Sequence, residues 1–410
     1  MNRKKIIKRS LRGILIIAVC GPIFIFFTIS RQHKKMMQGE MVSESPIDTI
    51  PFTYSSTGHI VIPVHIQDSK ETFSFILDTG ASNMIFSSRK DQFNFKRNGF
   101  GIGLGSSLNF FTTKINQCSL VQIGALRFEK VNFEEVNINS DCIDEICGII
   151  GTGIMHNLEW QIDFNTMQII IADSFKNLDT NPEAIKIPLH QNQFTSHLST
   201  RIKFRKNKQS HAVLIDLGNN GTLNMKERNI RKDSIPFETR KVLGIKSNTL
   251  GEKKVLESEF SYYLADSFFI GNLSACQLPI NAASKSLNIL GLGFFEHYKT
   301  TISYETSQLF LEPYQTSPRF IWNTYGFFTK YDEVTQKTII SNIIENSPAA
   351  NSNLPLYAEV LSINNFEFSD KESYCQYKNR KPFEGGRVKL TLNHNGEIEK
   401  YYLESTPVFE

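Results

Sequence analysis

The sequence is organised around one stretch, Thr72-Phe73-Ser74-Phe75-Ile76-Leu77-Asp78-Thr79-Gly80-Ala81-Ser82-Asn83. Its apolar side chains at 73, 75 and 77 alternate with smaller or opposite-facing residues, which is the periodicity of a β-strand. The strand runs into Asp78-Thr79-Gly80, where glycine permits backbone torsions that a side chain would forbid. An acid at the end of a buried apolar strand costs free energy unless hydrogen bonds or a second charge compensate it. We therefore expect Asp78 to have a functional role.

A second copy of this unit follows later in the chain. The first hairpin pairs residues 59–66 with 73–77 and ends at Asp78, and a second pairs residues 198–204 with 212–215 and ends at Asp216. The other matched landmarks are Gly124-Ala125-Leu126 with Gly271-Asn272-Leu273, Ile149-Ile150-Gly151 with Ile289-Leu290-Gly291, residues 161–166 with 301–306, and residues 169–171 with 309–311. Landmarks that recur in the same order and at nearly the same spacing predict two related units.

Asp78-Thr79-Gly80-Ala81-Ser82 after an apolar strand resembles the active-site loop of the aspartic proteases, both the retroviral and the pepsin-like kinds. With the repeat, this resemblance covers about residues 55 to 315. It implies an all-β, two-lobed acid-protease β-barrel fold with two pseudo-symmetric halves, in which 149–151 and 289–291 cross under the aspartate loops. It also implies that Asp78 and Asp216 share one proton and activate a water that hydrolyses a peptide bond, without metal or cofactor.

The two expected loops differ from each other. The first contains Thr79, Gly80, Ala81 and Ser82, and the second contains Leu217 and Gly218. Family members have Thr or Ser where Leu217 stands, and the two hydroxyls bond across the interface. A brace made from one side only, or replaced by packing, is therefore expected here. Thr79 and Ser82 are expected to hold the Asp78 carboxylate by hydrogen bonds.

A covering loop is predicted at about residues 98–113. It has no tyrosine, unlike the flap of pepsin-like enzymes, and its glycines at 99, 101, 103 and 105 suit a mobile loop. Two alternatives to the protease stay open. The chain could hold two tandem β domains whose Asp-x-Gly turns are only structural, or it could be an exported peptide-binding or scaffold protein that kept the fold and lost the chemistry.

The N-terminus indicates export. Six basic residues at positions 3 to 12 precede an apolar run, Ile14 to Ile29, without a suitable cleavage site after it. We predict an uncleaved transmembrane helix over residues 13–30, with the body periplasmic or extracellular; a cleaved signal peptide is the alternative. Residues 1–50 then form tail, anchor and linker. The net charge of +4 comes largely from the first 35 residues and does not suggest a nucleic-acid partner.

The six cysteines are too few for a disulfide scaffold. Cys142 and Cys147 bracket an acidic loop and could bridge in an oxidising compartment. Cys118, Cys276 and Cys375 are expected to be buried thiols. No cysteine or histidine spacing is typical of a zinc site.

The composition changes after Pro313, where residues 314–318 are typical of a linker. Residues 319–407 resemble a PDZ domain in the order of a glycine-aromatic loop, a strand, Ser347-Pro348-Ala349-Ala350 and Leu361-Ser362-Ile363-Asn364. The resemblance implies that the amides of Tyr325, Gly326 and Phe327 cradle the C-terminal carboxylate of a peptide ligand. A packed β module without a ligand is the alternative. The lobes before it are expected at 51–180 and 181–315, with a peptide or protein as substrate.

Overall fold

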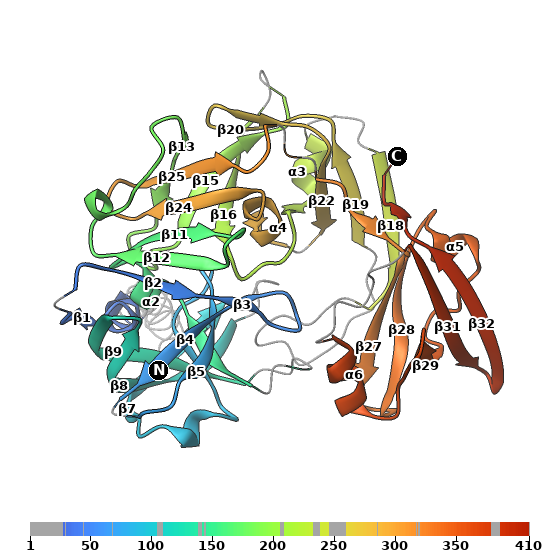
Figure 1. The fold of residues 1–410 in the computed structure, drawn as a ribbon, viewed down its shortest axis with the longest axis horizontal. Coiled ribbons are helices and arrows are strands. Elements are labelled where there is room, and N and C mark those ends of the chain that lie inside the picture. The colour runs from blue at the N-terminus through green and yellow to red at the C-terminus, as the bar shows by residue number, and fades with distance from the viewer. Residues whose placement is uncertain are drawn as a thin grey trace, which may run out of the picture.

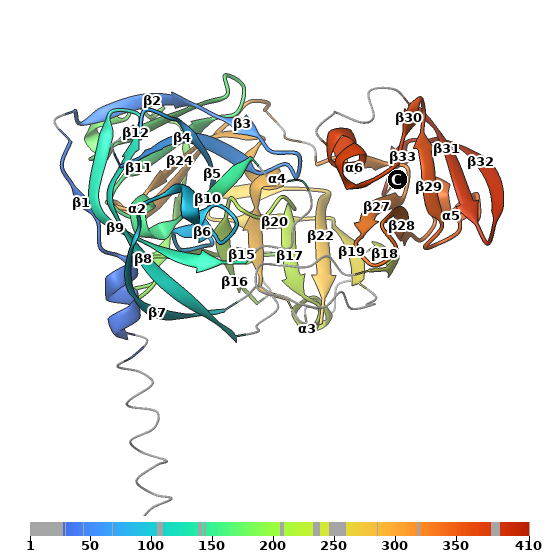
Figure 2. The ribbon, with the colours of Figure 1, turned by 90° about the horizontal axis from the view of Figure 1, so that it is seen from below.

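The computed structural model describes residues 28, 30–43, 45–67, 69–104, 110–137, 142, 145–205, 209–232, 238–245, 260–284, 286–316, 318, 320–378 and 386–409. Over these ranges the chain is mostly β-strand, in two stacked units with a smaller C-terminal module beside the second (Figures 1 and 2). Within them no helix has both the length and the apolar character needed to cross a membrane. The predicted anchor, residues 13–30, lies outside the described residues except for positions 28 and 30.

The first unit, residues 40–178, wraps one sheet into a barrel. The strand order is β1-β9-β6-β10-β5-β4-β8-β7. Strands β9 and β8 stand near opposite ends of this order and also pair with each other, so the sheet closes on itself. The strands are β1 (Glu40–Met41), β3 (Thr53–Tyr54), β4 (Ile60–Ile66), β5 (Phe73–Leu77), β6 (Met84–Phe86), β7 (Lys96–Leu104), β8 (Phe110–Ile123), β9 (Leu126–Val136) and β10 (Ile146–Ile150), with helices η1 (Lys90–Gln92), α2 (Thr152–Met155) and η2 (Phe175–Asn177).

The second unit, residues 185–313, repeats this strand order. Its central strands follow β22-β17-β23-β16-β15, as β9-β6-β10-β5-β4 do in the first unit. Its elements are β14 (His190–Gln191), β15 (Leu198–Lys203), β16 (His211–Asp216), β17 (Leu223–Lys226), α3 (Glu227–Lys232), β18 (Glu238–Gly244), β19 (Phe260–Ala265), β20 (Phe268–Ile270), β21 (Leu273–Ala275), β22 (Leu278–Ala283), β23 (Ile289–Gly291) and α4 (Leu292–Phe295). The hairpins predicted before each aspartate are thus present in the structure.

A six-stranded sheet joins the two units. Its order is β13-β25-β24-β11-β12-β2, so each unit gives one hairpin and one outer strand (Figure 1). The strands are β2 (Ile47–Pro51), β11 (Glu159–Asp163), β12 (Gln168–Ala172), β13 (Ile185–Pro188), β24 (Tyr298–Ser303) and β25 (Gln308–Pro313). Gln161 pairs with Thr301, its own counterpart in the repeat, and donates a 3.0 Å hydrogen bond to the Thr301 hydroxyl. The pseudo-twofold axis therefore passes between these two residues.

The C-terminal module, residues 320–409, has its own core. Its elements are β26 (Asn323–Thr324), β27 (Phe327–Asp332), β28 (Lys337–Ile344), α5 (Pro348–Asn351), β29 (Glu359–Ile363), β30 (Phe366–Glu367), α6 (Lys371–Lys378), β31 (Arg387–His394), β32 (Glu397–Glu404) and β33 (Thr406–Pro407). Ser347 caps α5, since its hydroxyl accepts from the amide of Ala350 and Pro348 begins the helix. The start of the predicted linker is attached to the first unit, because the Tyr314 hydroxyl donates to Asp163 at 2.8 Å.

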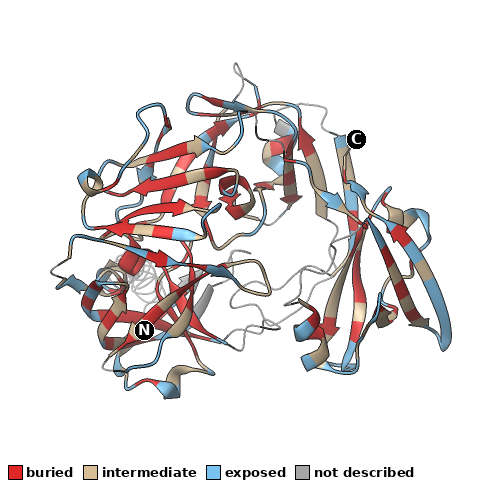
Figure 3. Cartoon of the chain, in the orientation of Figure 1, coloured by how far each residue is buried: buried red, intermediate tan, exposed pale blue. Residues whose placement is uncertain are grey.

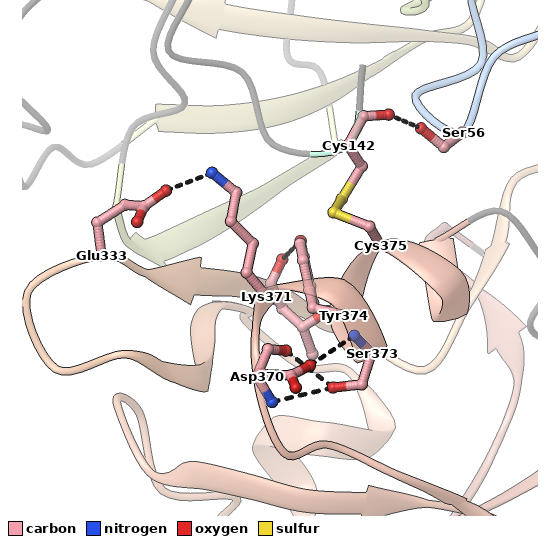
Figure 4. Close-up of a disulfide and its surroundings, with 9 residues drawn as sticks. Ser56, Cys142, Glu333, Asp370, Lys371, Ser373, Tyr374 and Cys375 are labelled. Atoms are coloured by element: carbon pink, nitrogen blue, oxygen red, sulfur yellow. Dashed lines mark hydrogen bonds and ion pairs between the residues drawn. A yellow bond between two sulfur atoms is a disulfide. The ribbon is translucent and has the colours of Figure 1, made fainter. Parts of the chain in front are cut away.

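The module is attached to both units. Strand β28 pairs antiparallel with β18, which continues the sheet of the second unit into the module. Val242, Ile344 and Val408 are buried together at this junction. On the other side, a disulfide joins Cys375 on α6 to Cys142 of the first unit (Figure 4). The cysteine predictions were therefore wrong on three points. Cys142 does not pair with Cys147, which is a buried thiol, Cys375 is not a free thiol, and Cys276 is exposed.

Burial alternates along β15, β16 and β22, whereas β6, β10 and β23 are buried at every residue. The inner faces of the two units and the joining sheet form one apolar cluster, and the module has a separate one (Figure 3). Trp160 on β11 and Tyr298 on β24 are fully buried in the large cluster. The joining sheet is thus part of the main core, which fixes the position of each unit against the other.

Candidate active site

Two parallel strand pairs bring the aspartates to the contact between the units. In the first unit β10 runs beside β5, with Ile150 next to Leu77, and in the second β23 runs beside β16, with Gly291 next to Asp216. The backbone amide of Asp78 donates to Ile150 at 3.0 Å. The predicted crossing strands therefore support the two aspartate loops, which we define as residues 78–82 and 216–220.

The two loops interlock at their glycines. A Cβ atom added to Gly80 would lie 2.4 Å from the carboxyl carbon of Asp216, and one added to Gly218 would lie 2.3 Å from that of Asp78. A side chain at either position would overlap the opposite carboxyl group. Glycine is thus required in each loop because the aspartate of the other loop lies directly against its backbone.

Backbone amides hold the two carboxyl groups. Gly80 donates to Asp78 Oδ1 at 2.7 Å, and Gly218 donates to Asp216 Oδ1 at 2.9 Å. Burial raises the pKa of Asp78, while hydrogen bonds from Gly80, Asp216 and other loop groups oppose the rise. Burial and then the negative charge of Asp78 raise the pKa of Asp216 well above its usual range. The pair therefore retains one proton at a pH where separate aspartates would both be ionised.

One threonine hydroxyl braces both loops. Thr79 Oγ1 donates to the carbonyl of Ile215 at 2.9 Å and accepts from the amide of Leu217 at 3.0 Å. The Leu217 side chain is fully buried in the main apolar cluster instead of returning a hydroxyl. The brace is therefore one-sided, and packing takes the place of its second half.

Thr79 and Ser82 do not hold the Asp78 carboxylate, contrary to the expectation from the sequence. The Thr79 hydroxyl is used by the second loop, and Ser82 Oγ donates to Glu134 Oε2 at 3.2 Å. Loop amides donate to the Asp78 carboxylate instead, among them that of Gly80. Ala81 has a backbone role, since its carbonyl accepts from the amide of Thr152 at 2.9 Å.

The glycines of the predicted covering loop have a packing role that the sequence did not reveal. Strands β7 and β8 form this hairpin, and a Cβ atom on Gly101 would lie 2.6 Å from the Thr113 hydroxyl of β8 and 2.7 Å from Gln32 Nε2. Gly99 has φ +134°, and a Cβ atom there would lie 3.2 Å from Lys35 Nζ. Gly101 thus makes room for Gln32 and Thr113, and the φ of Gly99 favours glycine. That these glycines make the hairpin mobile stays a prediction.

A turn before β4 connects the second aspartate loop to the disulfide. Asn220 of the loop donates to the carbonyl of Thr57, and Ser56 Oγ donates to the carbonyl of Cys142 at 2.7 Å (Figure 4). The His59 ring hydrogen-bonds to the backbone of Gly218, and burial lowers the pKa of that histidine. Contacts thus run from α6 of the module through the disulfide to the loop of Asp216.

The predicted carboxylate loop of the module lies apart from the aspartates. Gly326 has φ +84°, and a Cβ atom there would lie 1.9 Å from the Ser347 hydroxyl. The amide of Gly326 donates to Thr324 Oγ1 at 3.1 Å. Of the three amides expected to cradle a peptide carboxylate, those of Tyr325, Gly326 and Phe327, the middle one is therefore already engaged. Nowhere in the described part of the chain do three metal-binding side chains gather at one point.

No protein-family model and no curated protein matches the sequence. Among solved structures, the chain is similar to an aspartic proteinase from Irpex lacteus at 13% sequence identity, covering 65% of this chain and 97% of that one, with a TM-score of 0.42.

Proposed function

We propose that this protein is an aspartic endopeptidase, with Asp78 and Asp216 as its catalytic pair. The observation that carries the proposal is the interlocking of the loops, in which each glycine lies against the carboxyl group of the opposite aspartate. Two buried acids in contact cost free energy that a purely structural turn would not require. Their raised pKa values are those of a pair that shares one proton.

In this mechanism the ionised carboxylate accepts a proton from a water held between the aspartates, and the water oxygen attacks the peptide carbonyl. The protonated carboxyl group donates its proton to the carbonyl oxygen as the carbonyl carbon becomes tetrahedral. When the C–N bond of the intermediate breaks, the carboxyl group that took the water proton gives it to the leaving amine. The other carboxylate takes a proton from a hydroxyl of the intermediate, so the pair again holds one proton. The amides of Gly80 and Gly218 keep each carboxyl group oriented throughout.

The experiment is turnover of a peptide library by the purified full chain, with and without a statine-type transition-state mimic. Asp78→Asn and Asp216→Asn should each lower kcat by on the order of 10³-fold or more, because the pair acts as a unit. Both variants should fold, since Asn is nearly isosteric and removes a buried charge. A parent protein that binds peptides but turns none over at any pH would favour the scaffold alternative.

We also propose that the protein is held in a membrane by residues 13–30, with its catalytic body outside the cytoplasm. The basic residues before the apolar run support this orientation. A disulfide between distant parts of the chain fits an oxidising compartment.

For the module we propose a PDZ-like site that takes a peptide as an added strand along β27. Within the described residues, β27 pairs with β28 and with no other strand, so its second edge lies at the border of the sheet. Tyr374 on α6 donates to the carbonyl of Thr329 on β27 at 3.1 Å, so an added strand would displace this bond. Fluorescence anisotropy with labelled peptides ending in a free carboxylate tests the proposal. Amidated versions of the same peptides should bind much more weakly.

A further inference from the structure

The segment of residues 30–38, which directly follows the apolar run, packs against the first unit. Residues 30–36 are helical, and the side chains of Gln32 and Met36 are only 6% and 2% exposed. A buried glutamine is costly unless its amide group is fully hydrogen-bonded. The partners of Gln32 therefore show what the segment does.

Gln32 hydrogen-bonds to the backbone of the β7–β8 hairpin as a neighbouring strand would. Its Oε1 accepts from the amide of Ile102 at 2.8 Å, and its Nε2 donates to the Ile102 carbonyl at 3.1 Å. The absence of a side chain at Gly101 allows this approach. One side chain thus fixes the middle of β7.

The same amide group reaches the first aspartate loop through one intermediate. Gln32 Nε2 also donates to Glu134 Oε1 at 3.1 Å, and Glu134 Oε2 accepts from Ser82 Oγ at 3.2 Å. Glu134 is 4% exposed, and these two side chains are the hydrogen-bond partners of its two oxygens. Ser82 is therefore oriented by a buried carboxylate that Gln32 in turn orients.

A second group of contacts holds the start of β7. Lys35 Nζ donates to the carbonyl of Asn98, and the Asn98 amide group donates to Asn132 Oδ1 at 2.8 Å. The Asn132 amide group donates to the carbonyl of Lys35 at 2.8 Å. These three residues close a ring of hydrogen bonds between the segment, β7 and β9, so the segment is docked at two points.

We infer that Gln32 is a positioning residue of the proposed active site, which sets the β7–β8 hairpin against the loop of Asp78. The inference rests on the proposed peptidase function. It assigns the segment next to the predicted anchor a role in turnover in addition to attachment. Gln32 acts through Glu134 and Ile102 and does not itself contact the aspartates.

The test uses the full chain in detergent and four variants. Gln32→Met keeps the length of the side chain but removes its hydrogen bonds, and Lys34→Ala is the matched control because Lys34 is exposed on the same helix. Gln32→Glu places its carboxyl group against that of Glu134. The double variant Gln32→Glu with Glu134→Gln again has one amide and one carboxylate at this contact, with the two exchanged. Measurements are kcat, KM, the thermal midpoint and hydrogen exchange of residues 96–104.

Gln32→Met should lower kcat/KM by about tenfold, the factor that corresponds to one or two lost buried hydrogen bonds. Exchange over residues 96–104 should become faster. The thermal midpoint should fall below that of Lys34→Ala, because the amide and carbonyl of Ile102 and one oxygen of Glu134 lose their partner. Gln32→Glu should lose more activity, and Glu134→Gln should restore part of it. The inference is overturned if Gln32→Met matches Lys34→Ala in both activity and exchange, or if the added Glu134→Gln restores nothing. A parent without turnover would refute the proposed function instead, and unchanged exchange in Gln32→Met would then still refute the positioning role.

Discussion

The hydroxyl of Thr79 accepts a hydrogen bond from the backbone amide of Leu217, across the contact between the two units. The same oxygen donates to the carbonyl of Ile215, so one side chain satisfies two buried backbone groups of the opposite strand and loop. Because the hydroxyl is both donor and acceptor, no second hydroxyl is needed at 217. Thr79 thus links the two aspartate loops directly.

Thr79→Val should therefore lower the free energy of unfolding by about 1–3 kcal/mol, since it leaves a buried amide and carbonyl unpaired without changing the side-chain shape. Peptide turnover should fall with it as the loops separate. Thr79→Ser keeps the hydroxyl and should stay close to the parent in both measurements. A loss in the Ser variant with none in the Val variant would mean that the methyl group, not the hydroxyl, is what matters. Chemical denaturation and kcat on one peptide provide the comparison.

Leu217→Thr restores the residue type of the aspartic-protease loop but should not improve the protein. The leucine is fully buried among apolar side chains, so the change removes apolar contacts and buries a hydroxyl. We expect a loss of roughly 2–4 kcal/mol in unfolding free energy, as for other large-to-small core substitutions. Leu217→Met, which keeps the volume, should cost less than about 1.5 kcal/mol. A Thr variant as stable as the parent would show that the site can rebuild a two-sided brace.

The aspartate pair should make stability fall as pH rises. The pKa values of Asp78 and Asp216 are raised above the ordinary value of 3.8, so the folded protein binds more protons than the unfolded chain above that pH. Unfolding free energy then decreases with increasing pH until both raised pKa values are passed. Asp216→Asn should be more stable than the parent near pH 7, and the difference should shrink toward about pH 4. Asp91→Asn, at an exposed position, is the control. The measurement is urea denaturation at several pH values. If the unfolding free energy of Asp216→Asn and of Asp91→Asn changed with pH in the same way, the shared proton would be contradicted.

Removing the disulfide should loosen the module from the first unit. Cys142 and Cys375 are 233 residues apart, and a cross-link over so long a loop contributes up to about 5 kcal/mol in the chain-entropy model. Cys375→Ser should lower the thermal midpoint and increase hydrogen exchange in α6, whereas Cys276→Ser should change neither. Peptide mapping under non-reducing conditions should recover Cys142 and Cys375 in one cross-linked peptide. Recovery of Cys142 linked to Cys147 would restore the pairing considered from the sequence.

The membrane proposal predicts that the mature protein keeps residues 13–30. N-terminal sequencing of the membrane fraction should therefore find no new terminus between residues 32 and 45. Such a terminus would show that the apolar run is removed as a signal peptide. Carbonate washing, which strips peripheral proteins, should leave the chain in the membrane.

The sequence predicted what depends on local pattern. Alternating apolar residues identified the strands before both aspartates, and the repeat identified the strands beside them. It could not predict contacts that depend on three-dimensional packing. The bond between Cys142 and Cys375 joins distant segments, and Ser82 donates to Glu134, a residue 52 positions away in the chain. The role of Gln32 was also missed, since a single glutamine after an apolar run has no distinguishing pattern.

The disulfide makes most of the chain a covalent ring. It begins at Cys142, passes through the whole second unit and returns at Cys375. A single cut in any surface loop between the two cysteines opens this ring without releasing either piece. If the peptidase cut one of its own loops in this region, the two fragments would therefore remain covalently linked, and both aspartates would stay in one molecule. A reductant that breaks the disulfide would then separate the fragments.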